Sequence, residues 1–260
     1  MKYKMGRITA IGKYLFLESI RDKLFIALML ISVIIVAGNF ALDFFEQGIQ
    51  DRIIFDFGSA LASMLGAFLC LYLTVSHVRA QLDSKQAYFI LTSESSRTHF
   101  LVGKWLGAIA FTAFNVLIIF GEIFLIVYFN SGIFSYVSVI YFYIVMLKLS
   151  ILCSITAFFS VTSSLVVAPA LSVFFYFLGH WGNYLTYAVA KSGSGHYTIK
   201  LCEFATGYLL PNFKYFTAEH VVTENFAGAA QYLAWLTLYA VAADLIIIGA
   251  AAAVFRKKDL

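Results

Sequence analysis

The chain has 260 residues, of which 62% are hydrophobic and only 12% are charged, and its formal net charge is +4. An average soluble domain is roughly half apolar and about a quarter charged. This composition therefore excludes a water-soluble globular protein, which would have to expose large apolar patches. The chain is expected to be a single integral membrane domain.

The first 23 residues are basic and amphipathic, and they predict a helix that lies along the membrane surface. The residues expected on its apolar face are Ile8, Ile11, Tyr14, Leu15 and Ile20. Lys13, Arg21 and Lys23 are expected to remain in water. The alternative interpretation is a short solvated tail.

Six apolar stretches follow, each close to or above the roughly 20 residues that a membrane-spanning helix needs. They are residues 24–42, 53–78, 105–129, 136–159, 165–189 and 231–255. Apolar residues cover every face of these long runs, which favours helices over strands. We therefore expect an all-α membrane protein with six transmembrane helices and an interfacial helix before them.

The Lys and Arg residues outside these stretches are distributed unevenly. Thirteen lie in the N-terminal segment, in the connection after the second stretch or in the C-terminal tail, whereas four lie elsewhere outside the stretches. Cytoplasmic connections carry the excess of Lys and Arg in membrane proteins. Both termini are therefore expected in the cytoplasm, in agreement with an even number of spans.

Two polar regions are long enough to carry a function. The first is the cytoplasmic connection, residues 79–104, and the second is the external segment, residues 190–230. Within the external segment, short helices are expected at His196–Leu210, which ends before Pro211, and at Ala218–Glu224.

Gly103-Lys104 resembles part of a nucleotide-binding phosphate loop, but the rest of that motif is missing. The loop requires a glycine five positions before the Gly-Lys pair and a Ser or Thr after it, and Thr98 and Trp105 occupy these positions. We expect the glycine to permit close helix packing and the lysine to extend to the membrane interface. Metalloprotease motifs, a nucleophile elbow and metal-ligand clusters are also absent from the sequence, so neither an enzyme nor a metal site is expected.

The cytoplasmic connection resembles the segment between the second and third spans in permeases of type-2 ATP-binding-cassette exporters. The matching positions are Asp83, Tyr88, Ile90, Leu91, Thr92, Ser96, Arg97, Phe100, Gly103, Lys104, Leu106 and Gly107. Gly207–Phe216 is similar to the Leu-Pro-Asn segment before the last span of these permeases, and Phe255–Leu260 is similar to their usual ending. Ile54–Gly58 and Phe177–Leu185 resemble the subgroup associated with copper-enzyme maturation, so the resemblance extends over essentially the whole chain.

Three positions depart from the family pattern. Glu94 stands where a proline is usual, Gln81 stands where a glutamate is usual, and Gln86 stands where a threonine is usual. Contacts between this connection and a partner are therefore expected to differ from those of the family.

The resemblance implies that a separate ATPase subunit binds ATP and Mg²⁺ and docks on the cytoplasmic connection, while this chain holds no cofactor. The residues implied in that contact are Asp83, Tyr88, Leu91, Glu94, Arg97 and Lys104. A second permease copy or a paralogue, membrane lipid and a location in the cytoplasmic (inner) membrane are implied in the same way. The expected function is export of a substrate that the sequence does not identify.

Alternatives to this interpretation remain open. The connection can be an ordinary solvated loop, and the chain can be a scaffold or assembly factor that holds an extracytoplasmic protein through residues 190–230. A secondary transporter is less favoured, because such proteins often show internal repeats and broken mid-membrane helices. The 18% aromatic content fits lipid-facing surface and interface belts rather than a nucleic-acid-binding surface.

Ionisable residues within the apolar stretches are costly in lipid, so each predicts a partner. At about 1.5 Å per residue from the outer ends, Lys148 and Asp244 have similar depths, and Glu122 lies one or two turns higher. We expect Lys148 to pair with Glu122 or Asp244, either in a substrate path or to fix the register of the helices. His180 and Asn183 share one helix face and are expected to contact a polar substrate, or the histidine to make one internal hydrogen bond.

Gly58, Ala62 and Gly66 recur every four residues in the second stretch. Small residues at this spacing let helices approach closely in lipid. The pattern indicates either a contact with a second permease subunit or packing within one chain.

Overall fold

The computed structural model describes residues 2–37, 47–84, 96–131, 137–191, 211–216 and 226–257. Every regular element within these residues is a helix, which confirms the all-α class. The long helices are α1 (Lys2–Ile20), α2 (Lys23–Ala37), α3 (Gln47–Thr74), α6 (Arg97–Ser131), α7 (Val137–Thr162), α8 (Val167–Lys191) and α11 (Phe226–Lys257).

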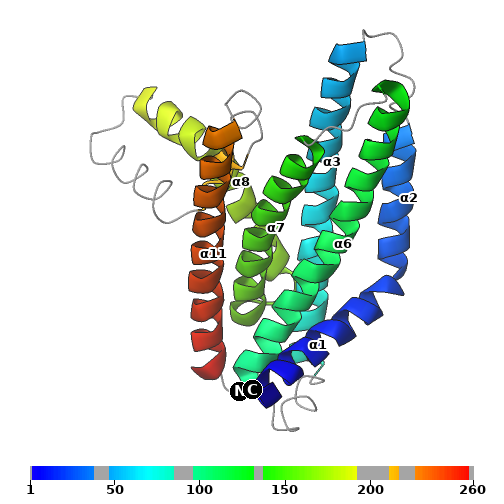
Figure 1. Cartoon of the computed structure of the whole chain (residues 1–260). Coiled ribbons are helices and arrows are strands. Elements are labelled where there is room, and N and C mark those ends of the chain that lie inside the picture. Colours follow the sequence, from blue (N-terminus) through cyan, green and yellow to red (C-terminus); the bar gives the residue numbers. More distant parts are fainter. Residues whose placement is uncertain are drawn as a thin grey trace.

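Helices α3, α6 and α7 form the centre of the bundle, with α2 on one flank and α11 on the other (Figure 1). Helix α1 crosses one end of the bundle over the first turns of α6 (Figure 1). The start of α1 and the end of α11 lie at this same end, which we call the terminal end (Figure 1). Helix α8 lies beside α7 and tilts away from the bundle at its far end (Figure 1).

Four helices in the described part of the chain are long and apolar enough to cross a membrane. They are Asp56–Asp83, Arg97–Phe129, Val139–Thr162 and Ala230–Lys257. The described apolar parts of α2 and α8 are shorter, at Lys23–Ile34 and Val167–Trp181. Four such helices indicate a multi-pass membrane protein, and the number of six spans stays a prediction.

A close contact between glycines joins α1 to the first turns of α6. A Cβ atom added to Gly107 would lie 2.8 Å from the carbonyl oxygen of Gly12, and one added to Gly103 would lie 2.9 Å from the Cβ of Ile11. Gly103 and Gly107 are one helical turn apart and therefore lie on the same face of α6. The expectation that Gly103 serves close helix packing is confirmed.

The side of α1 that packs against α6 includes only part of the predicted apolar face, and the contact of that face with a membrane stays a prediction. Leu15 is fully buried, whereas Tyr14 and Ile20, which were expected beside it, are exposed. Lys13 and Arg21 are exposed, as predicted. The glycine contact explains the difference, because it determines which side of α1 can approach α6.

A sharp turn at Asp22 joins α1 to α2. Its carboxylate accepts hydrogen bonds from the backbone N–H two residues later at 3.0 Å and from the hydroxyl of Tyr72 in α3 at 2.8 Å. Beside the turn, Phe16 and Phe25 pack edge-on against Phe111 of α6, with ring centroids 5.4 and 5.0 Å apart. The turn is thus attached to both α3 and α6.

Helix α6 begins at Arg97, about two turns before the third predicted stretch. The prediction that the connection extends as a loop to Lys104 is therefore wrong for its last part. Ser96 caps the helix, because its Oγ accepts a hydrogen bond from the N–H of His99 at 3.3 Å. These polar turns are helical because they pack against α1 and α11, and Phe100 within them is fully buried.

The second predicted stretch also continues beyond its expected end. After α3 the chain forms one π-helical turn, η2 (Val75–Arg79), and then a short helix, α4 (Ala80–Asp83). A π-helical turn admits an extra residue and changes the direction of the side chains that follow it. His77 in this turn is buried.

Little of the segment predicted to be external, residues 190–230, falls within the described residues. A short 3-10 helix, η4 (Phe213–Tyr215), follows Asn212, whose side chain accepts a hydrogen bond from the N–H of Lys214 at 3.1 Å. The helices predicted at His196–Leu210 and Ala218–Glu224 lie outside the described residues.

Candidate functional site

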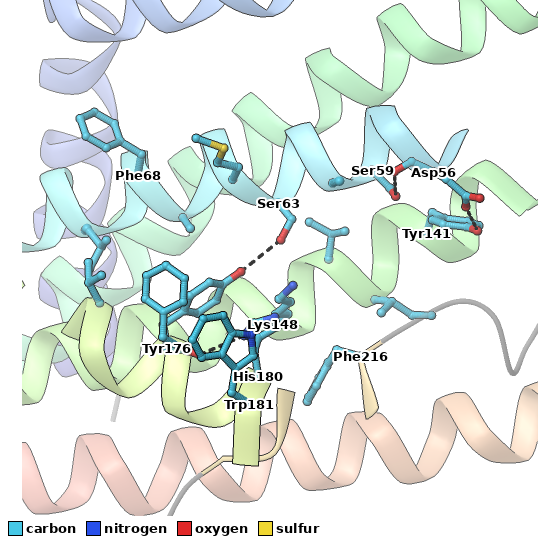
Figure 2. Close-up of a pocket in the computed structure, with 18 residues that line it drawn as sticks. Asp56, Ser59, Ser63, Phe68, Tyr141, Lys148, Tyr176, His180, Trp181 and Phe216 are labelled. Atoms are coloured by element: carbon cyan, nitrogen blue, oxygen red, sulfur yellow. Dashed lines mark hydrogen bonds between the residues drawn. The ribbon is translucent and has the colours of Figure 1, made fainter. Parts of the chain in front are cut away.

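A pocket of about 870 Å³ lies between α3, α7 and α8, with Phe216, directly after η4, also in its lining. Each element contributes side chains because it turns one face toward the others: Ser63 from α3, Lys148 from α7, and Tyr176 and His180 from α8. Figure 2 shows these four side chains close to one another, with Phe216 below them. The volume lies within the range of roughly 300–1,000 Å³ that ligand-binding pockets usually have.

The centre of the pocket is polar and carries one cationic side chain. Lys148 Nζ lies 5.5 Å from the centroid of the Tyr176 ring. The Tyr176 hydroxyl lies 3.4 Å from Ser63 Oγ, and His180 Nδ1 lies 2.9 Å from the Tyr176 carbonyl oxygen. Because a carbonyl oxygen only accepts, Nδ1 is the donor, and His180 makes the internal hydrogen bond that the sequence allowed. We name Ser63, Lys148, Tyr176 and His180 the polar centre.

A second polar contact lies at one end of the pocket. The hydroxyl of Tyr141 in α7 donates to Oδ1 of Asp56 in α3 at 2.9 Å. Asp56 is exposed and precedes Ser63 by about two helical turns, or roughly 10 Å along α3. Figure 2 shows this pair well apart from Lys148. The carboxylate and the ammonium therefore occupy separate parts of the pocket.

The remaining wall of the pocket is apolar and faces outward. Met64 and Phe68 of α3 and Phe177 and Trp181 of α8 line the pocket and are each more than half exposed. Exposed apolar side chains favour contact with other apolar groups over contact with water. The pocket thus opens between α3 and α8.

Gly179 explains how η4 reaches the pocket. A Cβ atom on Gly179 would lie 2.5 Å from the carbonyl oxygen of Pro211 and 2.5 Å from a ring carbon of Phe213. Phe213 stacks on His180 with ring centroids 5.3 Å apart. The absence of a side chain at this position lets the Pro-Asn segment lie directly on α8 and close one side of the polar centre.

The predicted ion pair of Lys148 is wrong. Neither Glu122 nor Asp244 forms an ion pair with Lys148 among the described residues. Asp244 instead accepts a hydrogen bond from Ser154 Oγ at 2.6 Å, and that hydroxyl accepts one from Trp105 Nε1 at 2.9 Å. This buried network joins α6, α7 and α11.

The starts of the helices explain the wrong pairing. Helix α11 begins at Phe226, more than a turn before the sixth predicted stretch, so Asp244 lies deeper in the bundle than expected. Ser154 and Asp244 both lie about five turns from the start of their helices, whereas Lys148 lies only about three turns into α7. Glu122 is directed toward α2, where its Oε1 lies 3.5 Å from the hydroxyl of Ser32.

The predicted coupling contact is only partly described. Tyr88, Leu91 and Glu94 lie outside the described residues. Asp83 forms a two-point ion pair with Arg79, at 2.7 and 3.1 Å. Asp83 and Arg97 thus lie on either side of residues 85–95, the middle of the connection, which is outside the described residues.

Arg97 holds the start of α6 against the end of α11. Its guanidinium donates to the backbone carbonyl oxygens of Phe255 at 3.1 Å and Arg256 at 3.3 Å. Cations at the C-terminal carbonyl groups of a helix are favourable, because these groups carry the negative end of the helix dipole. Arg97 is thus a contact within the chain.

Lys104 does not extend to an interface as expected. It is only 1% exposed, and its Nζ has no hydrogen-bond partner in the described part of the chain. The ammonium lies 5.8 Å from the Tyr14 ring centroid and 5.9 Å from that of Phe100. Aromatic rings attract a cation in this geometry. Helix α1 covers this lysine because the glycine contact beside it brings the two helices together.

One further polar contact at this end was not predicted. Nδ1 of His77 lies 3.5 Å from Oε2 of Glu18 in α1. The sequence gives no local signal for it, because the two residues are far apart in the chain and the π-helical turn orients the histidine.

The small residues of α3 pack within the chain. A Cβ on Gly58 would lie 2.5 Å from Ile123 of α6, and one on Gly66 would lie 2.6 Å from Leu149 of α7. Ala62, between them, is fully buried. This face is therefore occupied by α6 and α7 and is not open to a second subunit.

The last two expectations concern Asn183 and metal binding. Asn183 lies in α8, but its side chain is outside the described residues. Among the described residues, no group of three or more His, Cys, Asp or Glu side chains could hold a metal ion.

Comparison with known proteins adds no family assignment. A scan against protein-family models and a search of curated proteins both return no match for this chain.

Proposed function

We propose that this chain is a permease subunit of an ATP-driven exporter. ATP binds and is hydrolysed on a separate ATPase subunit, which docks on the connection between α4 and α6 at the terminal end. In this proposal the chain has six spans with both termini in the cytoplasm, and a second permease copy or a paralogue completes the transporter.

The observation that carries the proposal is the position of α6. This helix runs without interruption from Arg97, where the connection ends, to Ser131, and it packs against α1, α3, α7 and α11. A push on the connection therefore acts on a rigid element that contacts most of the bundle. Switching proteins commonly use such rigid-body shifts of packed helices.

Helix α6 also reaches the walls of the pocket. Val116 of α6 and Leu149 of α7 both pack on Gly66 of α3. Lys148 is next to Leu149 in α7, and Ala67, next to Gly66, lines the pocket. A shift of α6 would thus alter how α3 and α7 meet beside the polar centre, which supports coupling between the terminal end and the pocket.

The charges at the terminal end support the proposed orientation. The basic residues described there include Lys13, Arg79, Arg97, Arg256 and Lys257. Membrane proteins retain such residues on the cytoplasmic side.

The decisive experiment is purification of the tagged chain from its native membranes in mild detergent. We expect a P-loop ATPase to copurify, and its hydrolysis rate to change when the permease is present. The double variant Tyr88→Ala and Leu91→Ala should abolish copurification.

Lys214→Met, at an exposed residue of η4, is the matched control and should have no effect. Recovery of the chain with an extracytoplasmic protein and without an ATPase would contradict the export function and favour the scaffold alternative.

A further inference from the structure

The pocket separates a cationic part from an apolar part. Its single ammonium group, Lys148, has no carboxylate partner within ion-pair distance in the described part of the chain. An unpaired charge inside a bundle is costly unless a ligand or water completes it. A ligand with negative charge at this position would supply the missing partner.

Hydrogen-bonding groups line the pocket together with this ammonium. The hydroxyls of Ser63 and Tyr176 face each other at 3.4 Å, and the His180 ring lies against the Tyr176 ring with centroids 4.4 Å apart. Hydroxyl groups and an ammonium together can donate several hydrogen bonds to one anionic head. The polar centre therefore has the composition of a phosphate or carboxylate site.

The open side of the pocket is lined by apolar side chains. Met64, Phe68, Phe177 and Trp181 line it and are exposed toward the surroundings of the bundle. An apolar chain that leaves the polar centre between α3 and α8 would contact these side chains and remain out of water.

Asp56 helps to define the charge of the ligand. Its carboxylate lies roughly 10 Å along α3 from Ser63 and accepts a hydrogen bond from Tyr141. Figure 2 shows the Asp56–Tyr141 pair well apart from Lys148, and Asp56 is the only carboxylate that lines the pocket among the described residues. The cationic group of a compact zwitterionic head at Lys148 would thus have no carboxylate beside it, which favours an anionic head.

We infer that this pocket binds an anionic amphiphile, with its phosphate or carboxylate head at Lys148 and its apolar chain between α3 and α8. The inference that the pocket binds such a ligand depends only on the geometry of the pocket. The statement that the amphiphile is the exported substrate rests on the proposed function.

Native mass spectrometry of the full-length purified chain tests the inference. The probes are lysophosphatidic acid, lysophosphatidylcholine with the same acyl chain, and inorganic phosphate. We expect the anionic lipid to bind at least tenfold more tightly than the zwitterionic lipid. Displacement of the anionic lipid by inorganic phosphate at equal concentration would overturn the requirement for an apolar chain.

The variant Lys148→Met removes the charge and keeps an unbranched side chain. It should weaken lysophosphatidic acid at least tenfold and leave lysophosphatidylcholine unchanged, whereas Lys148→Arg and a control at the exposed end of α11, Lys257→Met, should keep the preference. Ser63→Asp is a second variant that retains the lysine and places a competing carboxylate beside the head, so it should also weaken the anionic lipid.

Circular dichroism and a monodisperse elution profile establish that each variant is folded. Equal affinity for both lipids, or unchanged affinity in both Lys148→Met and Ser63→Asp, would overturn the site. Lys148-dependent binding supports the site whether or not an ATPase copurifies. If the lipid binds and no ATPase is captured, the export function fails while the binding site stands.

Discussion

Gly107 of α6 lies so close to Gly12 of α1 that a Cβ atom on Gly107 would come within 2.8 Å of the Gly12 carbonyl oxygen. Backbone atoms meet backbone atoms here, so a larger residue cannot be accommodated by rotation of a flexible side chain. The contact fixes α1 on α6, the helix that begins near the end of the connection, residues 79–104.

Gly107→Val should therefore separate α1 from α6. We expect a loss of about 1–3 kcal/mol of stability, as for other overpacked sites, and faster tryptic cleavage at Lys13. Gly121→Val is the matched control, because Gly121 lies in the same helix and has no atom within 4 Å of the position of its Cβ. Thermal unfolding in detergent and timed proteolysis measure the two effects, and equal behaviour of both variants would contradict the packing.

The Trp105–Ser154–Asp244 network gives a second prediction. Ser154→Ala removes the donor to the buried carboxylate of Asp244 and the acceptor of the half-buried Trp105 indole, so each of these groups loses one hydrogen bond. Each such group costs about 1–3 kcal/mol, so the unfolding temperature should fall clearly. Ser172→Ala is the control, since the buried Ser172 hydroxyl bonds only to the carbonyl of its own helix at Ala168. A similar small change in both variants would show that the network contributes little.

Arg97 gives a third prediction, on the attachment of α11. Arg97→Gln removes the charged donor to the carbonyl oxygens of Phe255 and Arg256. Hydrogen bonds to charged groups contribute about 1.5–3 kcal/mol, so amide hydrogen exchange in the last turn of α11 should accelerate about tenfold or more. Arg79→Gln breaks an ion pair to the exposed Asp83 and should leave this exchange unchanged, because exposed pairs contribute little. Mass spectrometry of peptic peptides measures the hydrogen exchange of this turn in both variants.

The proposed orientation leads to a fourth prediction. Asp83 and Lys191 are exposed and are the last residues of α4 and α8. The proposed orientation places them on opposite sides of the membrane. In a variant with Cys202→Ala, a maleimide that cannot cross membranes should label Lys191→Cys in intact cells, but Asp83→Cys only after permeabilisation. Cys70 and Cys153 are buried and should stay unlabelled. Labelling of Asp83→Cys in intact cells would reverse the orientation.

The periodicity and length of the apolar stretches predicted the all-α class, because lipid leaves helices as the simplest way to satisfy the backbone. Helix limits were predicted less well. Arg97–Lys104 is polar and reads as a loop, yet α1 and α11 bury it as helix, and only Ser96 at the cap position signalled the true start.

Part of the candidate site could be predicted from the sequence, and part could not. Lys148 and His180 were identified because charge and imidazole are unusual in apolar stretches, and both line the pocket. Ser63 and Tyr176 were not identified, because hydroxyl groups are common in membrane helices and give no signal alone. The partner of Asp244 could not be derived either, since it depends on where α11 begins relative to α7.

The glycine contact between α1 and α6 also constrains the order in which the chain is assembled. Helix α1 leaves the ribosome before α6, but the surface that receives it belongs to residues about a hundred positions later. Until α6 has been inserted, α1 has no packing partner of its own at Gly12, and Lys104 has no cover. Docking of α1 thus has to wait for α6, and a nascent chain that stops before α6 cannot complete the terminal end.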